Sequence, residues 1–273
     1  MDFHKTIKLG GVPEHFNHPW KLWLHDNNGE FQNHNLLWQD FPSGSAAMIQ
    51  ALEADQIDVA FVLTEAIANA QMKGSQIVPL SVFVKSPLIW GIFSSIENPT
   101  ASVAPIAEKK YAISRFGSGS DLMARVDAKE RGEKISDQNW VIVNNLDGAR
   151  KALTKLEADL FFWEKWMTKP FVDLGELKMI DERATPWPCF VMVCNPTFTK
   201  ISEKINVLKE AYSEVLKLAN FCKFDPAFPQ ELSKKYGILE EDAKSWLRHV
   251  EWASDWISPD EAISKARQYL RSI

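Results

Sequence analysis

The stretch from Ser43 to Glu65 reads SGSAAMIQALEADQIDVAFVLTE and contains a turn, a helix and a strand in succession. Met48, Ile49 and Leu52 recur at the spacing that places apolar side chains on one face of a helix. The run from Asp58 to Leu63 is apolar almost throughout, as is typical of a parallel strand covered on both faces. The stretch therefore predicts the helix and buried strand from which α/β domains are built.

The same alternation continues on both sides of this stretch. Short apolar runs predict strands at Ile7–Gly10, Leu36–Gln39 and Ile77–Val84, and helices are predicted from Trp20 and over Ile67–Lys73. Up to Val84 the pattern is that of a mostly parallel sheet flanked by helices.

At Ser86-Pro87 the pattern starts again. Strands are predicted at 88–93, 110–113, 140–143 and 160–163, with helices at 120–131 and 147–156. Within this part, DGARKALTKLEADLFFWEK (147–165) repeats the helix, acidic turn and apolar strand of the first stretch. Any α/β protein contains such units, but the matching order of polar ends favours two similar lobes. From Lys200 onward the pattern is helical, and the last helix is predicted to begin at Ser258-Pro259.

Composition excludes several functional classes. The 273 residues carry a net charge of -5 and no basic stripe, so nucleic acid is not an expected partner. No apolar run is long enough to span a membrane, and the N-terminus has no secretory signal pattern. Three cysteines without metal-ligand spacing indicate buried, reduced thiols. We expect a cytoplasmic protein, or a periplasmic one if a leader has been removed.

Motifs for chemistry are missing from the sequence. It contains no GxSxG elbow, phosphate-binding Walker loop or complete dinucleotide fingerprint, so we expect no cofactor. His15 and His18 lie near Glu14, but three residues within one loop lack a standard metal spacing, and we expect no metal site. His15 is instead a candidate ligand contact, because the loop after the first strand borders the crevice in such folds.

The chain also resembles a known group of proteins. The segment from Ser43 to Ala66, the Ser86-Pro87 pair and the RFGSGS motif at Arg115–Ser120 resemble, in order and spacing, the solute-binding proteins for sulfonates, taurine, nitrate and pyrimidine precursors of thiamine. Within this group the chain is most similar to a signal-less subfamily, the Ca3427-like binding domains. The resemblance covers roughly residues 8–196.

This resemblance implies a two-lobed, type 2 periplasmic-binding-protein-like α/β fold. Lobe one would comprise residues 1–85 and 190–273, lobe two residues 86–189, and the C-terminal helices would pack on lobe one. The chain would cross between lobes near Ser86 and again at 189–194. Ligand contacts carried over from the family are Ser43, Gly44, Ser45, Thr64, Glu65, Ser118, Gly119 and Ser120, and we add Ser86 at the first crossing.

The chemistry of these residues suits an anion. Arg115 precedes Gly-Ser-Gly-Ser at a helix start, where free backbone N–H groups favour negative charge. The Ser43-Gly44-Ser45 turn offers the same chemistry, although in both places the serines could simply cap a helix. If the Gly119 segment touches ligand, Gly119→Val is expected to weaken binding with little change in fold.

Other candidates lie at the ends of strands and beside the crossings. Glu65 and Glu164 end equivalent strands and could accept hydrogen bonds from an amine or a ring N–H, so that the ligand would be zwitterionic; otherwise they are solvated or ion-paired loop carboxylates. Most of the eleven tryptophans are expected in the core. Trp90 and Trp187 flank the crossings, and we predict that their rings contact the ligand.

Two functions follow from these expectations. The first is a non-catalytic protein that closes two lobes over a small anionic, zwitterionic or aromatic ligand, with a membrane transporter as partner if it is exported. The alternative is a cytosolic enzyme of the menaquinone-synthesis or thiamine-pyrimidine-synthase type. The CCCFC motif of the synthase is absent from this chain, which argues against that enzyme. The most similar stretch is Cys189–Cys194. Against the menaquinone enzymes, His15 is the only general-base candidate near the expected site.

Overall fold

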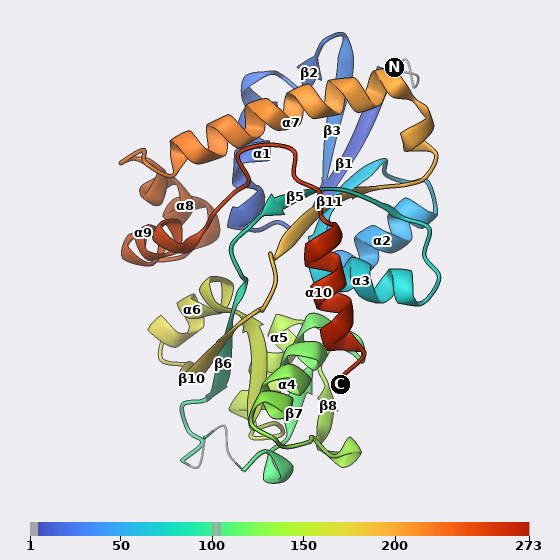
Figure 1. The fold of residues 1–273 in the computed structure, drawn as a ribbon. Helices are drawn as coiled ribbons and strands as arrows, with labels where there is room; N and C mark the ends of the chain where they lie inside the picture. Colours follow the sequence, from blue (N-terminus) through green and yellow to red (C-terminus); the bar gives the residue numbers. More distant parts are fainter. Residues whose placement is uncertain (1–4, 100–101, 103–104, 273) are drawn as a thin grey trace. The chain divides into compact units, whose positions relative to one another are not determined.

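The computed structural model describes residues 5–99, 102 and 105–272, which form two compact units (Figure 1). Unit 1 comprises the chain up to Pro87, Trp187–Tyr236 and Ala243–Arg267; unit 2 comprises Leu88–Pro186, Gly237–Asp242 and the chain from Gln268. The predicted two-lobed α/β fold is confirmed, because each unit has its own sheet. The predicted lobe two, residues 86–189, differs from unit 2 by two or three residues at each crossing. The segment Gly237–Asp242 and the chain from Gln268 were predicted in lobe one but belong to unit 2.

Unit 1 is built on a six-stranded sheet in the order β2-β3-β1-β4-β11-β5. Its strands are β1 (Thr6–Gly11), β2 (Glu30–Phe31), β3 (His34–Asp40), β4 (Val59–Leu63), β5 (Val78–Val84) and β11 (Phe190–Cys194). β1 pairs in parallel with β3 and β4, whereas β11 runs antiparallel to both β4 and β5. The sheet is therefore mixed rather than mostly parallel, because the returning strand β11 enters it beside β4.

Unit 2 contains a five-stranded sheet in the order β10-β6-β9-β7-β8. Its strands are β6 (Ile89–Ser95), β7 (Tyr111–Ile113), β8 (Trp140–Ile142), β9 (Leu160–Glu164) and β10 (Leu177–Ala184). β7 pairs in parallel with β8 and β9, and β6 runs antiparallel to β9 and β10. This sheet is mixed in the same way.

Helices surround both sheets. Unit 1 has α1 (His18–Asp26), α2 (Ser45–Glu53), α3 (Thr64–Met72), α7 (Ser202–Cys222) and α8 (Phe228–Tyr236), and unit 2 has α4 (Gly119–Glu130), α5 (Leu146–Thr154) and α6 (Lys165–Asp173). The chain ends with α9 (Glu240–His249) and α10 (Asp260–Leu270), as the helical pattern predicted. The short 3-10 helices are η2 (His15–Asn17), η3 (Ile106–Glu108), η4 (Asp137–Asn139) and η5 (Phe198–Lys200).

The sequence repeat is also a structural repeat. In both units a nine-residue helix leads through a tight turn to a five-residue strand, which is followed at once by a second nine-residue helix. The acidic residue of the turn plays the same part twice. Asp58 accepts the Lys8 N–H at 2.8 Å, and Asp159 accepts the Lys110 N–H at 2.8 Å. Each carboxylate thus ties the start of one parallel strand to the backbone of its neighbour.

Apolar packing fills each unit separately. In unit 1 the ring of Phe61 lies 4.8 Å from that of Phe83 and 5.2 Å from that of Trp20, between centroids. In unit 2, Phe93 and Phe161 are fully buried in one cluster with small side chains of α5. All three cysteines lie within the described residues and are buried, and none of them forms a disulfide.

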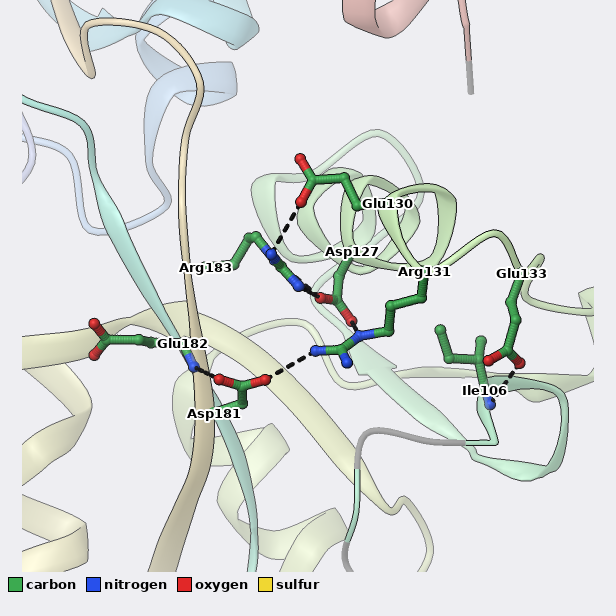
Figure 2. Close-up of polar contacts among 8 residues, drawn as sticks. All are labelled: Ile106, Asp127, Glu130, Arg131, Glu133, Asp181, Glu182 and Arg183. Carbon is green, nitrogen blue, oxygen red and sulfur yellow. Dashed lines mark hydrogen bonds and ion pairs between the residues drawn. The ribbon is translucent and has the colours of Figure 1, made fainter.

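An ion-pair network joins α4 to the edge strand β10 within unit 2 (Figure 2). Asp127 is only 2% exposed and accepts hydrogen bonds from two arginines, at 2.8 Å from Arg131 Nε and 2.9 Å from Arg183 Nε. Arg131 also contacts Asp181 at 2.8 Å, and Arg183 contacts Glu130 at 2.9 Å. A buried carboxylate therefore fixes the C-terminal part of α4 against β10.

Candidate functional site

In unit 1 the predicted Ser-Gly-Ser turn forms the start of α2. Gly44 precedes the helix with a φ of 78°, a left-handed conformation that suits glycine, and a Cβ placed there would meet no atom within 4 Å. Ser43 is exposed, whereas Ser45 is buried and its Oγ accepts the Leu63 N–H at 2.9 Å. The turn is thus open at Gly44 and joined to the end of β4 through Ser45.

The end of β4 continues directly into α3 and holds Thr64 and Glu65. The Thr64 hydroxyl donates to the backbone carbonyl of Pro188, and Glu65 Oε2 accepts the indole N–H of Trp187 at 2.8 Å. Glu65 is 3% exposed, and its Oε1 atom has no hydrogen-bond partner among the described residues. Trp187, predicted from its place beside the crossing, is therefore brought together with Glu65, from which it is separated by 122 residues.

Burial sets the protonation of Glu65. Loss of water around the carboxyl raises its pKa to about 7, and the hydrogen bonds from its own backbone N–H and from Trp187 only partly oppose this shift. At neutral pH the carboxyl is therefore close to half protonated, and it can either accept or donate a hydrogen bond through Oε1.

Ser86 and His15 have structural contacts in unit 1. The Ser86 hydroxyl accepts the Glu251 N–H at 3.1 Å, and the Ser86 carbonyl accepts the Cys189 N–H at 3.1 Å, so this residue joins the two crossing segments. His15 is fully buried, with its ring stacked on Phe16 at 4.7 Å and edge-on to Trp246 at 4.3 Å between centroids. Burial lowers the pKa of His15 to about 3, so its ring is neutral.

In unit 2 the Gly-Ser-Gly-Ser motif forms the start of α4. Ser118 is the N-cap; its Oγ accepts the Asp121 N–H at 3.4 Å and lies 3.0 Å from Ser120 Oγ. Ser120 Oγ also accepts the Ser114 N–H at 3.0 Å. Both hydroxyls therefore support the turn, as the capping alternative predicted, and a ligand at this start would meet backbone N–H groups first.

Trp90 lies directly over Gly119. A Cβ added at Gly119 would be 2.4 Å from Trp90 Cη2 and 2.9 Å from Cζ2, which is closer than real Cβ contacts. Trp90 is 4% exposed, and no described residue accepts a hydrogen bond from its indole N–H. The expectation that Gly119→Val would hardly affect the fold is therefore wrong, because the indole already occupies that space.

Arg115 and Glu164 differ in exposure. Arg115 is exposed in the turn ahead of α4. Glu164 is 4% exposed and caps α6, with its Oε2 accepting the Met167 N–H at 2.6 Å. Glu164 also lies opposite Trp90 in the β6–β9 ladder, so the predicted residues Trp90, Gly119 and Glu164 belong to one neighbourhood of unit 2.

Asp121 was not predicted, yet it contributes charge to the start of α4. Its Oδ2 accepts the Gly117 N–H at 2.8 Å, and its Oδ1 accepts the N–H of Arg125 Nε at 2.7 Å. Arg125 in turn stacks over the ring of Trp140, with its Cζ 4.5 Å from the centroid. The sequence contained a signal for this role of Asp121, because an acidic residue three positions after a serine N-cap is typical of the first turn of a helix.

We expect Gly119→Ala to lower the free energy of unfolding by about 1–3 kcal/mol, because the added methyl overpacks against Trp90. Urea unfolding followed by fluorescence measures this change. In the matched control the same substitution is made in a Trp90→Leu background, where the smaller side chain leaves room for the methyl. Equal losses in both backgrounds would show that Trp90 is not the obstacle.

Within residues 5–99, 102 and 105–272, no group of three or more His, Cys, Asp or Glu side chains is placed to hold a metal ion. His18, considered with His15 and Glu14 as a metal ligand, instead contacts Tyr236 Oη at 3.0 Å and Glu231 Oε1 at 2.9 Å. In the same part of the chain, no helix combines the length and the apolar character that crossing a bilayer requires.

Comparisons with known proteins agree with this architecture. Residues 90–183 match the family model described as Ca3427-like PBP. The Candida albicans CA3427 gene product, which defines a family with the generic periplasmic binding protein fold, is 26% identical, with a TM-score of 0.89 over 98% of this chain and 89% of that chain. No curated protein matches the sequence.

Two proteins solved with bound ligands share the fold at lower identity. The alkanesulfonate-binding protein SsuA from Xanthomonas axonopodis pv. citri, solved with MOPS, is 14% identical, with a TM-score of 0.76 over 98% of this chain and 91% of that chain. PhnD1 from Prochlorococcus marinus, solved with methylphosphonate, is 9% identical, with a TM-score of 0.55 over 80% of this chain and 90% of that chain. The predicted type 2 periplasmic-binding-protein-like fold and the resemblance to the Ca3427-like proteins are confirmed.

Proposed function

We propose, from the fold that this chain shares with the Ca3427-like and sulfonate-binding proteins, that it binds a small molecule carrying an anionic group. In this proposal the residues of unit 1 and those of unit 2 contact opposite ends of the ligand, and binding draws the two units together. The predicted contacts Ser43, Gly44 and Arg115 would serve the anionic group, because they are exposed or open beside the two helix starts.

The observation that carries the proposal is that, among the several buried polar atoms without a hydrogen-bond partner in the described residues, one in each unit belongs to a predicted ligand contact. Glu65 Oε1 in unit 1 and Trp90 Nε1 in unit 2 are both buried, and neither has a hydrogen-bond partner in the part of the chain that the structure describes. Such atoms are costly to leave unpaired in a folded protein, and a ligand donor or acceptor is one partner that would satisfy them. Both atoms belong to residues that were predicted as ligand contacts from the sequence.

The placement of His15 supports binding rather than catalysis. A general base must reach the proton that it removes, and it works best when its pKa lies near the working pH. His15 is fully buried among aromatic rings, and its pKa is lowered to about 3. The one histidine considered for acid–base chemistry is therefore better suited to packing. Similarity of the fold to solved components of ABC transport systems supports a membrane transporter as partner if this protein is exported.

The proposal is tested by native mass spectrometry of freshly purified protein, followed by thermal-shift titration with MOPS, methylphosphonate and taurine. A ligand present at 100 times its dissociation constant adds about 2.7 kcal/mol of stability, which is easily detected. Small-angle X-ray scattering of the same samples is expected to show a smaller radius of gyration with ligand. Chemical conversion of a bound compound during incubation would contradict a purely binding function.

A further inference from the structure

The carboxyl group of Glu65 has one oxygen occupied and one oxygen available. Oε2 is held by the indole N–H of Trp187 at 2.8 Å, which fixes the orientation of the carboxyl plane. Oε1 is buried and has no hydrogen-bond partner within the described part of the chain, and the residue as a whole is only 3% exposed. The fold therefore presents a single, oriented acceptor atom.

The surroundings of Glu65 bring no positive charge to this acceptor. No described lysine, arginine or histidine forms an ion pair with Glu65. Along α2, β4 and α3 the only other charged side chain is Glu53, which accepts a hydrogen bond from Ser75 Oγ at 2.6 Å. The segment around Trp187, Thr185–Cys189, carries no charged side chain either. An ionised Glu65 is thus stabilised by hydrogen bonds but by no positive charge of the described residues, which leaves a buried charge without an ionic partner.

We infer that Glu65 Oε1 binds a protonated amine of the ligand, so that the ligand is a small zwitterion with its ammonium at Glu65 and its anionic group at the helix starts. This inference rests on the proposed function and specifies the ligand class. The ammonium supplies both the missing hydrogen-bond donor and the missing positive charge. A ligand with only an anionic group would supply neither to an ionised carboxylate.

Proton release follows from this contact. Because the pKa of Glu65 is raised to about 7, roughly half of the free protein carries a proton on this carboxyl at pH 7. Binding an ammonium favours the ionised form, so about half a proton per ligand is expected to leave for the buffer at pH 7. Affinity for the amine is expected to rise with pH from 5 to 8, while the ligand amine itself stays protonated.

The experiment compares matched compounds that differ only in the amine. The pairs are taurine with ethanesulfonate, β-alanine with propionate, and 2-aminoethylphosphonate with ethylphosphonate. Isothermal titration in two buffers of different ionisation enthalpy measures both affinity and proton release. The wild type is expected to bind at least one amine compound 10-fold or more tightly than its partner, and Glu65→Gln is expected to abolish that preference. Glu53→Gln is the matched control, because it removes a carboxylate from the neighbouring helix, and it is expected to behave as the wild type.

The outcomes separate this inference from the proposed function. Equal affinity for both members of every pair, or an amine preference that survives in Glu65→Gln, would overturn the amine contact while leaving anion binding intact. Plain anions that bind more weakly as the pH rises through 7, with proton uptake, would show that protonated Glu65 donates to the anion instead. A wild type that binds none of the six compounds would contradict both the zwitterion inference and the proposed function.

Discussion

Asp127→Asn is expected to lower the free energy of unfolding by about 3 kcal/mol or more. Asp127 is 2% exposed and lies between Arg131 and Arg183, so the substitution leaves two guanidinium groups facing a neutral amide (Figure 2). Removing one partner from a buried ion pair costs about 3–5 kcal/mol, and the low end applies because both arginines reach solvent in part. Chemical unfolding monitored by circular dichroism measures the loss.

Glu130→Gln is the control for this substitution. Glu130 contacts the same Arg183, but its side chain is 36% exposed, and exposed ion pairs contribute at most about 1 kcal/mol. A loss below 1 kcal/mol in Asp127→Asn, equal to that of the control, would show that the network does not fix α4 to β10.

The second large effect concerns acid stability. The pKa of His15 is lowered to about 3 in the folded protein, against an ordinary value of 6.5 when unfolded. Between about pH 3 and pH 6.5 the imidazole of His15 therefore binds a proton in the unfolded chain but not in the folded chain. The stability that His15 contributes is therefore present above pH 6.5 and lost as the pH falls, at about 1.4 kcal/mol per pH unit and about 5 kcal/mol in total.

His15→Phe should remove this loss, because a phenyl ring can keep the stacking on Phe16 and the edge contact with Trp246 without titrating. The readout is the difference in unfolding free energy between variant and wild type at pH 7, 5.5 and 4.5, so a constant packing penalty cancels. Glu65 acts with the opposite sign: its pKa is raised to about 7, so its contribution is lost as the pH rises through 7. Identical pH slopes for the variant and the wild type would exclude His15 as the cause of acid sensitivity.

The helices and apolar strands of the fold could be predicted because their patterns are local. The α2–β4 stretch and its repeat at 147–165 were found from periodicity alone. β10 was missed because it is an edge strand whose residues DERA (181–184) are polar and largely exposed. The helix α6 was missed because Pro170 interrupts a short apolar pattern. The antiparallel entry of β11 depends on pairing across the chain, which no local pattern reports.

For the candidate site, the sequence indicated which residues to consider but not which of them contact one another. Glu65 was predicted to end a buried strand, but β4 ends at Leu63 and Glu65 lies in the first turn of α3, directly behind that strand. Its bond to Trp187 spans 122 residues, and the contact of Trp90 with Gly119 depends on how α4 lies against β6. A glycine in a helix start suggested space for a ligand, whereas the structure fills that space with an indole. Such contacts follow from tertiary packing, which residue type alone does not encode.

The late position of β11 in the sequence determines the order in which the two sheets can be completed on the ribosome. Every strand of the second sheet lies between Ile89 and Ala184, so it can close as soon as that segment has emerged. The first sheet, although started earlier, lacks the strand between β4 and β5 until Cys194 is synthesised. Two unpaired strand edges are thus exposed during translation, and such edges recruit other chains. The half of the molecule that begins first is expected to be the half that a nascent-chain chaperone must protect.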